Sequence, residues 1–110
     1  RYLKTLPYVD GERMAICGWS YGGYETLICL SVQSKAMGDG QLVWQCGIAI
    51  APVTSWRLYD SAYTERFMRR PQVNDSGYEK ADAIKLADQL KGNLLLVHGL
   101  ADENVHAQQS

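Results

Sequence analysis

A serine flanked by glycines is the part of this sequence whose residue types and spacing best suit catalysis. Segment 18–24 reads Gly-Trp-Ser-Tyr-Gly-Gly-Tyr, with the serine at position 20. It follows the apolar run 14–17 and precedes a helix-like stretch, 25–34. A strand, then Gly-x-Ser-x-Gly, then a helix is the order of a nucleophile elbow, a sharp turn that exposes the serine hydroxyl. The pattern predicts that Ser20 is a nucleophile; the alternative is a glycine-rich turn with an incidental serine.

The neighbours of the serine suit the same chemistry. Side chains at positions 18 and 22 would collide where the strand and the helix pass each other, which explains the two glycines. The residue after the serine is Tyr21. Its backbone N–H lies at the helix N-terminus, where negative charge is stabilised. We expect this amide to be one donor of an oxyanion hole.

Asp102 is the candidate for the acid of a catalytic triad. In α/β-hydrolases the order along the chain is serine, acid, histidine, and the acid follows a later strand of the same sheet. The run 94–97 (Leu-Leu-Leu-Val) predicts such a strand, and Asp102 follows it by a few residues. The carboxylate would hold the imidazole of the histidine in the required tautomer. Glu103 is a rival carboxylate, and helix capping is an alternative role for Asp102.

Neither histidine of the chain fits the place of the general base. His98 ends the predicted strand before Asp102, so we expect it to have a hydrogen-bonded structural role. His106 follows Asp102 by four residues on a predicted helix, beside its own acid. We therefore expect the base to lie outside this chain. The chain alone should be inactive, because serine without a base is a weak nucleophile.

The elements around these residues alternate between strand and helix, which predicts a parallel α/β fold. Two of the strands are short and continuously apolar, as expected for burial on both faces. The helix expected at 79–90 should turn Ile84, Ala87 and Leu90 inward and end near Gly92. Strands are expected at 14–17, 46–51 and 94–97. Helices are expected at 2–6, at 25–34, from Thr54 through Trp56, Tyr59 and Tyr63, at 79–90 and from 104 onward. Turns or loops are expected at 35–41 and 74–77.

The composition is that of an ordinary globular domain. The chain has 110 residues, 46% of them hydrophobic and 21% charged, with a net charge of -1. This charge argues against nucleic acid as a partner, and no apolar run approaches the roughly 18 residues of a membrane span. Cys17, Cys29 and Cys46 lack metal-ligand spacing, so we expect buried free thiols and no metal. Arg1 and Ser110 do not look like natural termini, and we expect an internal piece of a longer chain.

Several separated motifs occur together in this chain. They are segment 18–24, Ala51-Pro52-Val53, Trp56, the run 59–67 (Tyr-Asp-Ser-Ala-Tyr-Thr-Glu-Arg-Phe), His98-Gly99 and the run 101–106 (Ala-Asp-Glu-Asn-Val-His). In this order they resemble the catalytic domain of the prolyl oligopeptidase family of serine peptidases, over nearly the whole chain. The resemblance implies that residues 1–110 are part of an α/β-hydrolase domain. A propeller domain, the catalytic histidine and a second oxyanion donor would then lie outside the chain.

The resemblance also implies a role for individual residues. Ser20 would be the nucleophile, Asp102 the triad acid and the Tyr21 amide an oxyanion donor. Asn104 would contact the substrate backbone. A pocket for the proline ring before the scissile bond would be formed by Val53, Trp56, Tyr59, Tyr63 and Val105.

The activity that the resemblance implies is the release of N-terminal dipeptides with proline or alanine in second place. The reaction would pass through an acyl-enzyme, without a metal or an organic cofactor, and a homodimeric parent is compatible with it. Three alternatives stay open. The chain could belong to another α/β-hydrolase, such as an acylaminoacyl peptidase or esterase, or to a non-catalytic binding homologue. The aromatic residues could be core packing.

Overall fold

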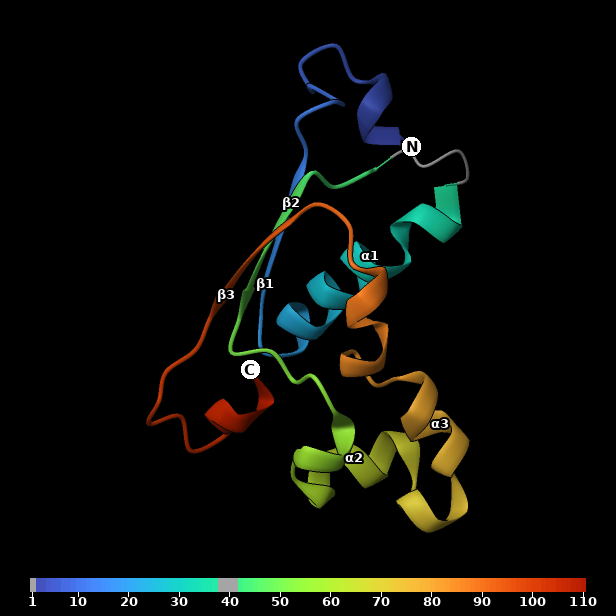
Figure 1. Ribbon diagram of the computed structural model, residues 1–110, viewed down its shortest axis with the longest axis vertical. Coiled ribbons are helices and arrows are strands. Elements are labelled where there is room, and N and C mark those ends of the chain that lie inside the picture. The colour runs from blue at the N-terminus through green and yellow to red at the C-terminus, as the bar shows by residue number, and fades with distance from the viewer. Residues whose placement is uncertain (1, 38–41) are drawn as a thin grey trace.

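Three short apolar runs form the parallel sheet that the sequence predicts. The computed structural model describes residues 2–37 and 42–110. The strands pair parallel in the order β1-β2-β3, so that Cys17, Ile48 and Leu95 lie side by side across the sheet (Figure 1). The strands are β1 (Ala15–Trp19), β2 (Cys46–Ile50) and β3 (Asn93–Val97). Each begins and ends within two residues of its predicted position, and the fold class is parallel α/β as predicted.

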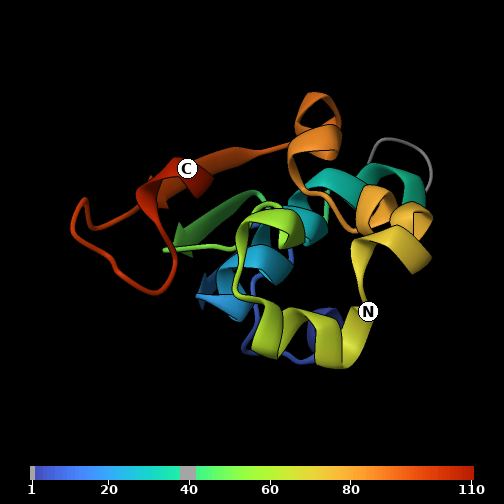
Figure 2. The same cartoon turned by 90° about the horizontal axis from the view of Figure 1, so that it is seen from below.

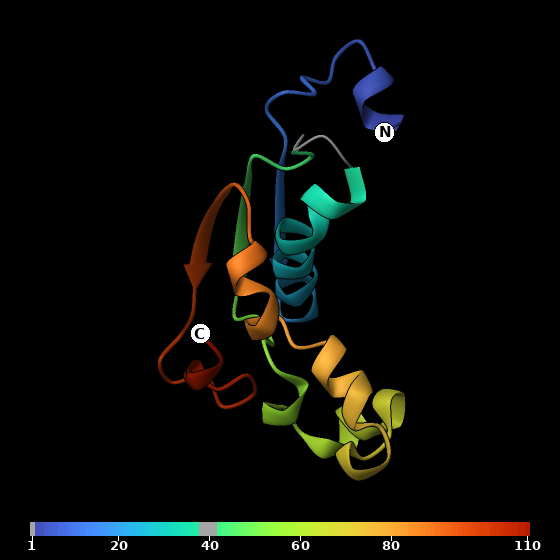
Figure 3. The same cartoon turned by 45° about the vertical axis from the view of Figure 1, so that its right-hand side comes forward.

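One long helix covers one face of this sheet. Helix α1 (Tyr21–Met37) follows β1 after a single residue. Its Leu30 is fully buried, and its Leu27 packs with Ala49 of β2. Gly47 makes this approach possible, because a Cβ there would lie 2.6 Å from the Cδ1 atom of Leu30. Figure 3 shows α1 alongside β1 and β2, with β3 at the outer edge of the sheet.

After β2 the chain leaves the sheet and forms a group of short helices at one end of the molecule (Figure 1). Residues 51–56 are all buried. Val53, Trp56 and Tyr78 form an apolar cluster with Val105, which comes from the segment after β3. The short helices at this end are η2 (Trp56–Leu58), α2 (Ser61–Met68), η3 (Pro71–Val73) and α3 (Asp75–Lys80). The helix that follows, η4 (Ile84–Gln89), lies beside α1 (Figure 1).

The predicted helix 79–90 and the predicted loop 74–77 are both wrong. The loop residues form the start of α3, and the helix is interrupted at Asp82. The carboxylate of Asp82 is buried; it accepts hydrogen bonds from the hydroxyl of Ser55 and from the amide of Ile84, both at 3.0 Å. A side chain that binds nearby backbone in this way competes with helix formation. As a result Ile84 is 56% exposed and Ala87 is exposed, whereas both were expected to point inward.

The predicted burial of β3 on both faces is also wrong. All five of its residues are exposed, because among the described residues no helix packs over β3 as α1 packs over β1 and β2. The prediction of buried thiols fails in the same way for Cys17, which is exposed on β1, while Cys29 and Cys46 are half-buried. Apolar composition predicted the strands correctly but not what covers them.

Three further segments differ from the predictions. Helix α1 continues through residues 35–37, which were expected in a turn, and residues 38–41 of that turn lie outside the described residues. The N-terminal helix is a short exposed 3₁₀ turn, η1 (Tyr2–Thr5). The segment after residue 104 forms the 3₁₀ helix η5 (Ala107–Gln109) instead of an α-helix.

Within the described part of the chain, no helix combines the length and apolar character that crossing a membrane requires.

Candidate active site

Ser20 occupies the turn between β1 and α1. Its backbone φ is +56°, in the left-handed region that serine rarely adopts. Hydrogen bonds hold this conformation from both sides. The Ser20 amide donates to the carbonyl oxygen of Ile50 in β2 at 2.8 Å, and its own carbonyl accepts from the amide of Tyr24 in α1 at 3.1 Å. The strained turn of a nucleophile elbow is therefore present, anchored to the sheet and to the helix.

Two close contacts explain the glycines around this turn. A Cβ at Gly18 would lie 2.0 Å from the carbonyl oxygen of Gly22, a distance at which the turn cannot close. The expected clash at Gly22 itself is wrong, because a Cβ there would meet nothing within 4 Å. The position that sequence reasoning missed is Gly23. A Cβ at this site would lie 3.0 Å from the Cβ of Pro52, where α1 passes the segment after β2.

The parallel sheet brings three loops to one edge. Because all strands run in the same direction, their carboxyl ends meet, which is where open α/β sheets hold their sites. Ser20 follows β1, Ala51 follows β2 and His98 follows β3. The amide of Ala51, which has a φ of +43°, donates to the carbonyl oxygen of Val97 at 2.7 Å. The backbone at the ends of the strands is thus hydrogen-bonded up to the point where the loops begin.

A small aromatic cavity opens beside Ser20. Its volume is about 80 Å³. Trp56 stacks on Tyr63, with ring centres 6.1 Å apart and an angle of 20° between the planes. Tyr59 meets both rings edge-on. The residues that line the cavity are Ser20, Tyr21, Val53, Trp56, Tyr59 and Tyr63.

The way in which these aromatic residues are positioned differs from the prediction. A single helix beginning at Thr54 was expected to carry them, with Tyr59 and Tyr63 one turn apart. Instead, Tyr59 is extended between η2 and α2, and the carboxylate of Asp60 caps α2 by accepting from the Tyr63 amide at 2.8 Å. The two rings still touch, with centres 5.4 Å apart.

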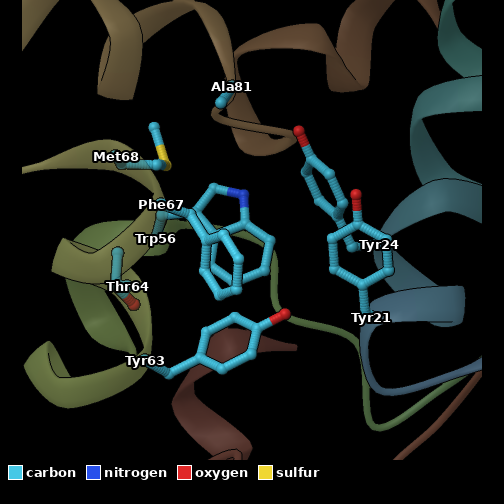
Figure 4. Close-up of a pocket in the computed structure, with 8 residues that line it drawn as sticks. All are labelled: Tyr21, Tyr24, Trp56, Tyr63, Thr64, Phe67, Met68 and Ala81. Carbon is cyan, nitrogen blue, oxygen red and sulfur yellow. The ribbon is translucent and has the colours of Figure 1, made fainter.

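A second, larger cavity of about 500 Å³ shares Tyr21, Trp56 and Tyr63 with the first. Figure 4 shows Tyr21 and Tyr24 entering it from α1, opposite the side chains that α2 contributes. Sequence reasoning did not identify this cavity, since its walls come from three helices and from the residue after α3, and the contacts among them have no local pattern. Its lining residues are Tyr21, Tyr24, Trp56, Tyr63, Thr64, Phe67, Met68 and Ala81.

Asp102 stands in a tight turn after β3. Its Oδ1 atom accepts hydrogen bonds from the amides of Asn104, at 2.9 Å, and Val105, at 3.0 Å. These two bonds, that of Asn104 first, hold the pKa of the Asp102 carboxyl below its usual range, so the group is ionised at neutral pH. The other oxygen, Oδ2, lies 3.8 Å from the Nε2 atom of His98. The rival carboxylate, Glu103, is exposed.

The two residues expected to bind substrate beside Asp102 lie next to the aromatic cavity. The Oδ1 atom of Asn104 accepts a hydrogen bond from the Tyr59 hydroxyl at 3.0 Å. Val105 is buried against Val53 and Trp56. The structure therefore brings Asn104 and Val105 against residues that line the cavity beside Ser20, although they are separated from Ser20 by some eighty positions of sequence. Asp102 is connected to them through the amides that it accepts.

The two histidines differ in their surroundings. His98 is hydrogen-bonded through both ring nitrogens, to the Val105 carbonyl at 2.7 Å and to the Ser110 hydroxyl at 2.5 Å, as its predicted structural role requires. His106 is exposed. Among the described residues, no group of three or more His, Cys, Asp or Glu side chains is placed to hold a metal ion.

The pKa values of two tyrosines at the cavities are raised. A hydrogen bond to the Glu25 side chain is the largest cause for Tyr21. Burial is the largest cause for Tyr24. Both phenols are therefore neutral at neutral pH and can donate hydrogen bonds there.

Gln109 joins the segment after β3 to the segment after β2, and nothing in the sequence indicated it. Its buried Oε1 atom accepts from the amides of Thr54, at 2.8 Å, and Ser55, at 3.0 Å. The Thr54 hydroxyl, expected to cap a helix, donates instead to the Gln109 carbonyl at 2.6 Å. Figure 2 shows the C-terminal segment, in red, curling back toward the end of β2. This contact places the loop of Asp102 beside the strand end that leads to Trp56.

A family model and individual relatives of known sequence both point to one protein family. The sequence model of the prolyl oligopeptidase family matches residues 1–110. The protein named "Probable dipeptidyl-aminopeptidase B" of Metarhizium robertsii is 51% identical over 112 aligned positions, which cover 100% of this chain and 12% of that protein. Its namesake in Ajellomyces dermatitidis is 54% identical over 94% of this chain and 11% of its own length.

A solved structure resembles the fold closely. The crystal structure of Porphyromonas gingivalis dipeptidyl peptidase 4 superposes with a TM-score of 0.83 at 55% sequence identity. The match covers 94% of this chain and 14% of that one. The chain therefore spans about one eighth of the length of its relatives, and its fold is a segment of an α/β-hydrolase catalytic domain.

Gly18→Ala should prevent the elbow from forming in the full-length protein, because its Cβ would overlap the backbone of Gly22. We expect the variant to lose labelling of Ser20 by a fluorophosphonate and to melt at a lower temperature. Gly22→Ala is the matched control, since its Cβ meets nothing within 4 Å and alanine favours a helix. Equal behaviour of the two variants would contradict this account of the turn.

Gln109→Ala should destabilise the domain, because it leaves the buried amides of Thr54 and Ser55 without an acceptor. Each unsatisfied buried group costs about 1–3 kcal/mol. Differential scanning calorimetry of the full-length variant should show a lower Tm for the transition of this domain. The control is Gln108→Ala, at an exposed neighbouring position, which should leave the Tm unchanged.

Proposed function

Because this chain belongs to the prolyl oligopeptidase family, we propose that it carries the catalytic serine and acid of a serine peptidase that releases N-terminal dipeptides. The observation that carries the proposal is the geometry of Ser20. This residue stands at positive φ between a parallel strand and a helix, and it opens on a cavity walled by aromatic rings. The names of the relatives support the dipeptide-releasing activity.

In the proposed reaction the Ser20 hydroxyl oxygen attacks the carbonyl carbon of the scissile bond, and its proton passes to a histidine. The C–N bond then breaks, the amine leaves with that proton, and water hydrolyses the acyl-enzyme. The Tyr21 amide, at the N-terminus of α1, would stabilise the oxyanion. Asp102 would orient the histidine through Oδ2, since Oδ1 already accepts two amides of its own turn.

We propose that this histidine is supplied from outside the 110 residues. His98 uses both ring nitrogens within its own loop. His106 lies four positions from Asp102 and is exposed. That residues 1–110 are the middle of a catalytic domain accompanied by a propeller, and that the parent is a homodimer, are predictions of the same proposal.

The substrate preference that we propose is proline or alanine in second place. The cavity beside Ser20 is small, and its walls are ring faces and edges. A pyrrolidine ring packs well on such walls and brings no amide proton that needs a partner. We expect the shape of these walls to exclude long or branched side chains. Asn104, held by the Tyr59 hydroxyl, is proposed to contact the substrate backbone.

Two other functions would use part of this site. An acylaminoacyl peptidase or esterase would use the same elbow at Ser20 with a different pocket. A non-catalytic homologue would bind peptides in the same cavity without turnover. The strained backbone at Ser20 favours the catalytic function, because such strain is usually retained where chemistry requires it.

Ser20→Ala in the full-length protein should abolish turnover of a Gly-Pro chromogenic substrate, and Asp102→Asn should nearly do so. Losing a triad member costs on the order of 10⁴-fold or more in kcat. Labelling of Ser20 by an organophosphonate, located by mass spectrometry, provides a second measurement. Glu103→Gln, at the exposed neighbouring carboxylate, is the matched control and should keep its activity. An active Ser20→Ala variant would refute the proposed function.

Tyr63→Ala should weaken the preference for proline more than it slows the chemistry, because it removes one wall of the cavity. Losing such contacts is typically worth about 1–3 kcal/mol in selectivity. The measurement is the ratio of kcat/KM for Gly-Pro and Gly-Leu substrates. Phe67→Ala is the matched control, since Phe67 touches Tyr63 on the same helix but does not line this cavity. An unchanged ratio in Tyr63→Ala would make Tyr63 a packing residue only.

A further inference from the structure

The imidazole of His98 bonds to two other residues of the segment that carries Asp102. His98 stands at its start, directly after β3, and the side chain is only 6% exposed. Its Nε2 atom lies 2.7 Å from the carbonyl oxygen of Val105, and its Nδ1 atom lies 2.5 Å from the hydroxyl oxygen of Ser110. The ring therefore links the beginning of the loop to Val105 and to Ser110, which follows η5.

The chemistry of the two partners determines which ring nitrogen of neutral His98 carries the hydrogen. The Val105 carbonyl can only accept, so Nε2 must carry the hydrogen and donate it. Nδ1 is then the acceptor, and the Ser110 hydroxyl donates to it. Because the ring is held at both nitrogens, its orientation and tautomer are fixed without any other group.

The peptide units around Val105 connect this imidazole to the carboxylate of Asp102. The amide of Val105 donates to the Oδ1 atom of Asp102 at 3.0 Å, while the carbonyl of Val105 accepts from His98. A shift of Val105 would therefore move the group that holds Oδ1. It would also rotate Oδ2, which no hydrogen bond holds among the described residues, since its 3.8 Å separation from His98 is longer than a hydrogen bond.

We propose that His98 is a positioning residue for Asp102, and that it acts through its hydrogen bond to the Val105 carbonyl. The inference rests on the proposed function, in which Asp102 orients the catalytic histidine. His98 does not touch substrate or the reacting atoms. It sets the direction in which Asp102 presents Oδ2. Val105, which transmits this effect, is packed in the same buried cluster as Trp56, a residue of the cavity wall.

A pair of substitutions separates the two hydrogen bonds of the ring. In His98→Gln the amide nitrogen can reach the place of Nε2 and still donate to Val105. In His98→Asn the shorter amide reaches only the place of Nδ1, so the Ser110 partner is kept and the Val105 bond is lost. Ser110→Ala removes the Nδ1 partner alone.

The experiment measures kcat and KM for a Gly-Pro substrate in the full-length protein, per mole of Ser20 that a fluorophosphonate labels at completion. A misplacement of about 1 Å can cost on the order of 100-fold in rate. We expect His98→Asn to lower kcat by about 10- to 100-fold with little change in KM. His98→Gln and Ser110→Ala should keep most of the activity. Labelling corrects for any molecules that fail to fold.

A second comparison shows whether His98 acts through Asp102. In the Asp102→Asn background, His98→Asn should cause no further loss, because the carboxylate that it positions has already been removed. A full additional loss in that background would overturn the inference, as would equal losses in His98→Asn and His98→Gln, or an unchanged His98→Asn. The proposed function fails on a separate result, which is full activity of Ser20→Ala or Asp102→Asn.

Discussion

Parallel pairing of three short strands is the constraint on which the rest of this structure depends. Because β1, β2 and β3 run in one direction, the loops that follow them begin at the same edge. Two backbone hydrogen bonds extend the pairing past the strands, from Ser20 to Ile50 and from Ala51 to Val97. Backbone hydrogen bonds alone thus fix the relative positions at which the three loops begin, at Ser20, at Ala51 and at His98. Each one-residue slip in pairing would turn the side chains to the opposite face and disperse the site.

Buried polar contacts then fix the loops that leave this edge. Gln109 accepts from the amides of Thr54 and Ser55, and the Ser55 hydroxyl binds the carboxylate of Asp82. One chain of contacts therefore runs from Gln109 in the segment after β3, through the segment that positions Trp56, to the start of η4. These bonds fix their partners, because breaking any of them leaves a desolvated group behind. Apolar packing alone would allow these loops to slide.

The sequence predicted the parts of this site that depend on local pattern. Apolar runs predicted the strands, and Gly-x-Ser-x-Gly between a strand and a helix predicted the sharp turn at Ser20, where the structure has a φ of +56°. The failures share a different cause. The Asp82 carboxylate, which interrupts the predicted helix by binding the nearby Ile84 amide, is also held by a hydroxyl 27 positions earlier. The role of Gln109 comes from amides 54 and 55 positions away. Burial of β3 depends on what packs over it. Contacts of this range leave no periodic trace in sequence, so pattern reasoning cannot find them.

The strain at Ser20 explains why the glycines are distributed as they are. A non-glycine residue at positive φ costs about 1–3 kcal/mol and persists only when its surroundings over-determine it. Here the sheet, through Ile50, and the first turn of α1, through Tyr24, hold the serine from opposite sides. Glycine is needed instead at 18 and 23, where the backbone of the turn and the Pro52 segment come within 2.0 and 3.0 Å of a would-be Cβ. Glycine therefore occupies the positions of closest approach, while the strained position itself carries the serine hydroxyl.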